Sequence, residues 1–157
     1  MMSALNKLKL NIEVQFASAA IEKKMAEIAP FPLLKKWVKT AIRINGQLTL
    51  RFVNHAESRR LNFHFRKIDK ATNVLTFLYD VSQQSVSADI VLCLPVISRE
   101  AKTQKKMMHS HLAHMIIHGC LHAQGYDHEE EKDAHTMETK EVALLDSLGF
   151  ASPYLAL

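Results

Sequence analysis

The sequence contains few of the residues that interrupt or cross-link a chain. Its 157 residues include four glycines, four prolines and two cysteines. So little glycine and proline excludes a collagen-like or low-complexity protein. Two cysteines are too few for the disulfide framework of a small secreted domain. Because Cys93 and Cys120 both lie in apolar runs, we interpret them as buried free thiols and expect a cytoplasmic protein.

Long apolar segments and a strong net charge are also missing. No segment approaches the ~20 apolar residues that a bilayer span needs, so no membrane association is expected. The N-terminal region alternates between apolar and polar residues from Leu8 to Phe16, which is unlike the apolar core of a signal peptide. The net charge is only +4. This mild excess of basic residues is compatible with a polyanionic partner but does not identify one.

Hydrophobic periodicity predicts one α/β (α+β layered) domain over residues 1–157, with a small mixed sheet of about four strands packed with about five helices. Strands are expected at 8–16, 47–53, 73–78 and 89–94. Helices are expected at 33–42, 56–63, 96–103, 107–124 and 127–149, with a further helical stretch around 19–28. A turn is expected at Asn45-Gly46, and an irregular loop at 80–87.

Histidine is the residue type in clear excess. There are nine, and seven of them lie close together, at positions 109, 111, 114, 118, 122, 128 and 135. His118 and His122 are four residues apart on a predicted helix, so their Cβ atoms share a face at ~5–6 Å. Gly125 ends that helix, and the turn after it can return His128 to the same face. Three histidine ligands leave one position open, which is typical of a catalytic zinc site.

The other histidines leave alternatives open. A single pair four residues apart is weakly specific, because both side chains can simply face water. His111 and His114 extend the same stripe, and each suits a hydrogen-bonding or packing role as well as a ligand role. His114 is the main competitor for a place in the ligand set. His109 and His135 are assigned to the surface.

Three neighbouring residues refine the expected site. Gly119 lies inside the helix, where glycine costs ~1 kcal/mol relative to alanine, so a close approach by another element is expected. In His-Glu-x-x-His metalloproteases this position carries the glutamate base, and its absence disfavours a protease. Cys120 lies about 200° around the helix from His118 and is excluded as a ligand. Asp127 is expected to cap the final helix, with an outer hydrogen bond to a ligand histidine as the alternative.

The eleven residues from His118 to His128 resemble the His-Gly-x-Leu-His-x-x-Gly-Tyr-Asp-His signature of the YbeY family. Those proteins are bacterial metal-dependent endoribonucleases of ribosomal RNA maturation and ribosome quality control. A second similarity covers Leu61-Asn62, Arg66 and Thr72–Phe77, the last matching the family's Thr-Asn-Val-Leu-Ser-Phe. Further matches are Asp89–Cys93 and Leu148–Phe150. The chain departs from the family pattern in two loops, at Ala71 and at Ser87-Ala88.

The resemblance implies one zinc ion per chain on His118, His122 and His128, and a catalytic role for Arg66. It also implies a zinc-dependent, single-strand-specific endoribonuclease that acts in 16S ribosomal RNA 3′-end maturation. The implied partners are ribosomal RNA and components of the small ribosomal subunit. Two alternatives remain, a non-catalytic, metal-stabilised ribosome-associated factor and a zinc peptidase.

Arg66 suits a phosphate because its planar guanidinium can donate two parallel hydrogen bonds. The alternative is a surface ion pair with Asp69, worth ~0–1 kcal/mol. Other basic residues could follow an RNA backbone, although a solvated surface explains most of them equally well; they are Arg59, Arg60, Lys67, Lys70, Arg99, Lys102, Lys105 and Lys106. If they bind RNA, affinity should fall steeply with salt.

Overall fold

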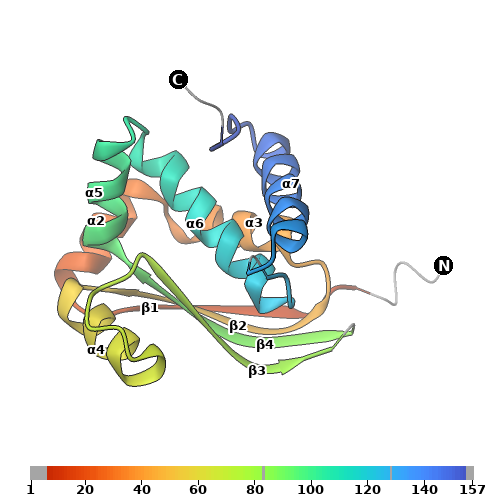
Figure 1. Cartoon of the computed structure of the whole chain (residues 1–157), viewed down its shortest axis with the longest axis horizontal. Coiled ribbons are helices and arrows are strands. Elements are labelled where there is room, and N and C mark those ends of the chain that lie inside the picture. The colour runs from red at the N-terminus through yellow and green to blue at the C-terminus, as the bar shows by residue number, and fades with distance from the viewer. Residues whose placement is uncertain (1–6, 83, 128, 155–157) are drawn as a thin grey trace.

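Four strands form one mixed sheet in a computed structural model that describes residues 7–82, 84–127 and 129–154. The strand order is β1-β2-β4-β3 (Figure 1), with β1 at Leu10–Phe16, β2 at Asn45–Val53, β3 at Val74–Val81 and β4 at Ser85–Cys93. Strands β1, β2 and β4 are parallel, whereas β3 is an edge strand antiparallel to β4.

Helices cover the sheet unevenly. They are α2 at Ala19–Ile28, α3 at Phe31–Ala41, α4 at His55–Arg66, α5 at Leu94–Thr103, α6 at Met108–Ala123 and α7 at Glu131–Ser147. Helices α3, α6 and α7 stand over one face, and α4 lies at one end on the other side (Figure 1). The predicted α/β layered class is confirmed, with four strands and six helices in the described part of the chain. None of the helices described there combines the length and apolar composition needed to span a membrane.

Helix α6 is the centre of the main core. Its residues Leu112, Ile116 and Ile117 are fully buried and belong to one cluster with strand residues such as Leu50 and Ile90. Burial of apolar surface at ~25 cal/mol per Å² is the main force that fixes this helix on the sheet. The helix that carries most of the histidines is therefore rigidly placed.

Two predicted irregular segments are regular in the structure. Asn45-Gly46 was expected as a turn, but both residues belong to β2, where Gly46 pairs with Leu10 and donates its amide to the Lys9 carbonyl. A Cβ at Gly46 would meet the Val86 carbonyl oxygen at 2.0 Å, so glycine allows the strands to approach. The loop expected at 80–87 is mostly strand, because β3 and β4 continue their pairing past a register shift near Leu78.

The predicted cap of the last helix is wrong. Helix α7 begins at Glu131, with Glu130 at the cap position. The Asp127 carboxylate instead accepts a hydrogen bond from the Glu129 backbone amide at 3.3 Å. The turn after α6 is thus stabilised locally, and α7 starts four residues later than expected.

Candidate metal centre

The glycine in α6 marks the contact between this helix and the sheet. A Cβ built at Gly119 would lie 2.8 Å from Ile90 Cγ2 and 3.4 Å from Val74 Cγ2. The close approach predicted from the sequence is confirmed. Any side chain at this position would point into β3 and β4, so a glutamate base would have to displace the Ile90 side chain or the helix.

The end of α6 shapes the site. Gly125 has a positive φ of 94°, its amide donates to the His122 carbonyl, and the Tyr126 amide donates to the Leu121 carbonyl. This pair of bonds is a Schellman motif, which turns the chain sharply back over the helix end. As a result the Tyr126 carbonyl lies 2.9 Å from His122 Nδ1 and accepts a hydrogen bond from it.

His118 and His122 face one another as the sequence predicts. Their Nε2 atoms are 3.1 Å apart. His118 Nδ1 lies 3.4 Å from Glu141 Oε1, and His122 Nδ1 bonds the Tyr126 carbonyl. Because both Nδ1 atoms donate, a neutral ring presents a lone pair at each Nε2. Two lone pairs at this distance favour a proton or a cation between them.

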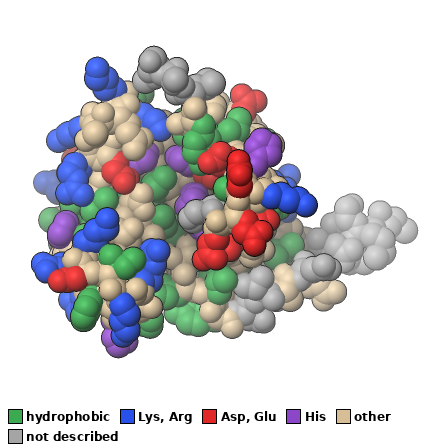
Figure 2. All heavy atoms as spheres, in the orientation of Figure 1, with side chains coloured by type: hydrophobic (Ala, Val, Ile, Leu, Met, Phe, Trp, Pro, Cys, Tyr) green, Lys and Arg blue, Asp and Glu red, His purple; other side chains and the backbone are tan. Residues whose placement is uncertain are grey.

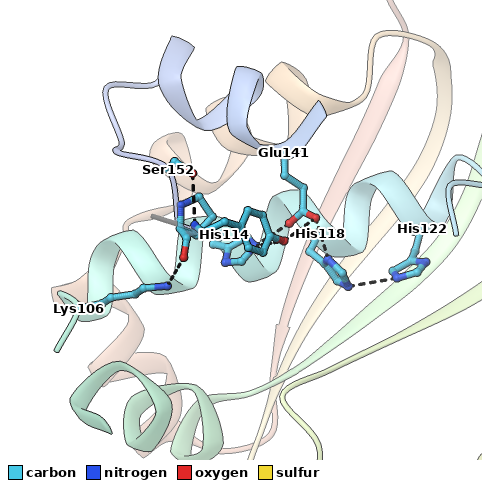
Figure 3. A network of polar contacts seen from close by, with 8 residues as sticks. Lys106, His114, His118, His122, Glu141 and Ser152 are labelled. Atoms are coloured by element: carbon cyan, nitrogen blue, oxygen red, sulfur yellow. Dashed lines mark hydrogen bonds and ion pairs between the residues drawn. The ribbon is translucent and has the colours of Figure 1, made fainter. Parts of the chain in front are cut away.

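Glu141 on α7 joins this pair to a third histidine. Its carboxylate accepts from His114 Nε2 at 2.6 Å and from the Tyr154 hydroxyl at 3.0 Å, in addition to the longer contact with His118 (Figure 3). The residue is only 1% exposed. A buried carboxylate requires such partners, because an unpaired charge in the interior is costly.

These contacts also govern the protonation of the network. Burial by itself raises the pKa of Glu141, but the hydrogen bonds and charges of His114 and His118 outweigh it and lower the pKa to about 2. Burial and the nearby Glu141 charge raise the pKa of the Tyr154 hydroxyl. Glu141 is therefore anionic and Tyr154 is a neutral donor at neutral pH.

The network contains a group that could hold a metal ion. His114, His118 and Glu141 bring ligand atoms within 4.8 Å of one another. The structure therefore supports a possible metal site at α6 and α7, and it adds Glu141 to the residues expected from the sequence. His128 lies outside the described residues.

A cleft of about 730 Å³ opens beside the histidine pair. His118, His122 and Arg66 all line it, together with residues 72–76, Leu78, Gly125, Tyr126, Asp127 and Glu129. Arg66 is exposed at the end of α4. Its expected alternative partner, Asp69, instead pairs with Arg59 at 2.7 Å. The ion-pair interpretation of Arg66 is wrong, and the cleft brings this arginine to the same hollow as the histidines.

The three other described histidines of the cluster differ in their exposure. His111 is buried and lies 3.0 Å from Glu100 Oε1, a hydrogen-bonding role that the sequence left open. His109 was assigned to the surface, but it is half-buried between the rings of Trp37 and Phe150. His135 is exposed, as expected.

Glu141 was missed from the sequence, although a signal was present. The buried residues of α7 are Met137, Glu141 and Leu145, at a spacing of four. A glutamate in the middle of an apolar stripe predicts a buried carboxylate with a cationic or hydrogen-bonding partner. Only the tertiary structure identifies that partner as the histidine stripe of α6.

Comparison with known proteins places the chain in a family. The family model described as "Endoribonuclease YbeY" matches residues 8–149. A protein of that name from Polynucleobacter asymbioticus is 58% identical over 94% of this chain and 95% of its own length. One from Janthinobacterium is 45% identical over 98% of this chain and 99% of its own. The chain belongs to the YbeY family.

Membership in the YbeY family confirms the resemblance read from the His118–His128 signature. It makes the chain an endoribonuclease, which hydrolyses phosphodiester bonds. The fold has a counterpart in a protein of Thermotoga maritima solved in solution, with a TM-score of 0.62 at 24% identity over 92% of this chain and 99% of the other. At that identity the likeness concerns the fold alone.

Proposed function

We propose that this protein is a zinc-dependent, single-strand-specific endoribonuclease acting in 16S ribosomal RNA 3′-end maturation and ribosome quality control in the cytoplasm. Its partners would be ribosomal RNA and small-subunit components. The observation that carries the proposal is the shared cleft of the His118–His122 pair and Arg66.

The donor geometry fits zinc. Two nitrogens bound at ~2.0–2.1 Å by a tetrahedral zinc ion are about 3.3 Å apart, and the two Nε2 atoms here are 3.1 Å apart. We assign His118, His122 and His128 as the ligands of one zinc ion, which supplies Lewis-acid chemistry when bound. Glu141 then serves best as the outer partner that orients His118, because its carboxylate already accepts three hydrogen bonds.

Arg66 is the residue that we expect to bind the phosphate. It forms no ion pair with any described acidic residue, and it lines the same cleft as the histidines. Its fork of donors can hold two phosphoryl oxygens and stabilise the charge that develops on them during cleavage.

Substitutions of His122 and Arg66, each with control variants, test these two assignments. His122→Ala should lose bound zinc, whereas His114→Ala and the exposed control His135→Ala should retain it. Arg66→Ala should retain both zinc and fold but lose cleavage of single-stranded RNA by roughly 100-fold or more, and the exposed Arg43→Ala is its matched control. Full zinc occupancy in His122→Ala would refute the ligand assignment. Wild-type cleavage in Arg66→Ala would remove this residue from the mechanism.

A further inference from the structure

Helix α4 packs on the core through Leu61, but it buries polar side chains and exposes aromatic ones. Its buried residues are Ser58 and Asn62, while Phe63 and Phe65 are 55% and 57% exposed. A helix on a protein surface normally turns its aromatic side toward the core. Core packing therefore does not account for the position of Phe63.

Polar contacts fix this orientation. The Ser58 hydroxyl donates to the Thr72 carbonyl and accepts from the Thr72 amide, both at 2.9 Å. The Asn62 amide donates to the Lys70 carbonyl at 2.9 Å. The helix is thus held to the chain segment beside the cleft by its polar side, which leaves Phe63 facing outward. Phe65 is three residues after Asn62 and lies on the anchored side, where its ring packs against Phe77.

The same surface is basic. Residues 59–70 contain five basic residues and one acidic residue. The single acid, Asp69, is already paired with Arg59. The other four, Arg60, Arg66, Lys67 and Lys70, form no salt bridge with a described acidic residue. Figure 2 shows Lys and Arg side chains gathered on the side where α2, α4 and α5 lie, with acidic side chains on the other side of the hollow.

The basic surface of α4 reaches the cleft through Arg66, which lines it. Phe63 is one turn before Arg66, so their Cβ atoms are ~5–6 Å apart on the same side of the helix. Phe63 also borders a separate hollow of about 470 Å³ lined in part by Arg59 and Arg60. The ring of Phe65 rests edge-on against Phe77, with centroids 4.9 Å apart, which holds it in place without covering it.

An exposed aromatic ring among cations that form no salt bridge suits an unpaired RNA strand, since a base can stack on the ring while phosphates contact the cations. We propose that Arg60, Phe63, Arg66 and Lys67, the α4 surface, bind the unpaired nucleotides next to the bond that is cleaved. This rests on the proposed function, in which the phosphodiester lies at Arg66. Paired bases have no free face to stack, so the surface would also select single strands over duplex.

The test compares two single-stranded probes about ten nucleotides long, one with bases and one abasic, by fluorescence anisotropy. The intactness of each strand is checked on a gel afterwards. The wild type should bind the strand with bases more tightly. Phe63→Ala should weaken that binding roughly 5- to 150-fold, corresponding to ~1–3 kcal/mol per stacked base, and leave abasic binding unchanged. Phe63→Tyr should restore it, and Phe31→Ala, an exposed phenylalanine on α3, should have no effect.

The salt dependence of RNA affinity distinguishes the contribution of base stacking from that of phosphate contacts. Phe63→Ala should leave the slope of log affinity against log salt unchanged, whereas Arg60→Gln should reduce it by about one phosphate contact. Wild-type binding in Phe63→Ala, with thermal unfolding confirming its fold, would overturn the proposal. An equal loss of affinity for the abasic probe in Phe63→Ala would also overturn it. A wild-type protein that prefers bases but does not cleave would instead contradict the proposed function alone.

Discussion

Glu141 illustrates how one residue can control a site without touching the substrate. Its carboxylate fixes His118 through Nδ1 and also binds His114 and Tyr154. A histidine whose Nδ1 donates to a carboxylate is locked in one tautomer and directs Nε2 outward. A contact of this kind holds the ring in the orientation that a metal bond at Nε2 needs.

Glu141→Gln should therefore lower zinc affinity about 10- to 100-fold while the protein stays folded. Zinc affinity is measured by competition with a chromogenic chelator. The control is Glu138→Gln, an exposed glutamate on the same helix, which should bind zinc as the wild type does. Complete loss of zinc in Glu141→Gln, with retention in His122→Ala, would show that Glu141 is itself a ligand.

At the scale of elements, the contact of α6 with β3 and β4 decides where the histidines point. Gly119 lets the helix lie directly on Ile90 and Val74. The neighbours His118 and His122 are then turned toward the edge of the sheet, where β3 and α4 form the other side of the cleft. The glycine thus has a packing role, and the absence of a glutamate at this position follows from it.

Gly119→Ala should destabilise the fold by about 1–3 kcal/mol, because the added methyl group must displace the Ile90 side chain or the helix. The expected result is a lower denaturant midpoint with an unchanged slope. Helix propensity by itself predicts that Gly119→Ala stabilises the fold, since alanine is favoured over glycine in a helix interior. A stabilised variant would therefore show that the contact at Ile90 relaxes easily.

At the scale of the whole molecule, the pair His118 and His122 lies outside the main apolar core. The core cluster runs through α3, α6 and the sheet, and the histidine pair occupies the cleft at the end of α6. The apolar core thus forms without the histidine pair. We therefore expect the protein to stay folded without metal, unlike small domains that fold only with their metal.

Removal of zinc by a chelator should abolish RNA cleavage but leave the far-ultraviolet circular dichroism unchanged. The melting temperature should fall, because a ligand that binds only the folded state at 1,000 times its Kd contributes about 4 kcal/mol, or roughly 8–16 °C for a protein of this size. Unfolding at room temperature on chelation, with no cleavage before it, would instead favour a metal-stabilised factor without catalytic activity.

Much of the site was predictable from local sequence, because helix geometry is local. His118 and His122 share a face because an α-helix has 3.6 residues per turn. The helix ends at Gly125 because the left-handed backbone conformation at that position favours glycine. Strand ends were less predictable. Asn45 and Gly46 look like a turn by composition, and only their pairing with β1 makes them strand.

The sequence by itself determined the family, the α/β class and the histidine pair, since these depend on periodicity and on a contiguous signature. The tertiary structure decided what lies around that pair. Asp69 forms its ion pair with Arg59, so Arg66 has no ion pair with Asp69. Glu141 on α7 contacts His118 on α6. Helix α4 is anchored through Ser58 and Asn62, so Phe63 faces outward. Such contacts join residues that are distant along the chain, or they decide which of two nearby residues forms an ion pair. Both depend on how whole helices and strands pack together, which local sequence does not determine.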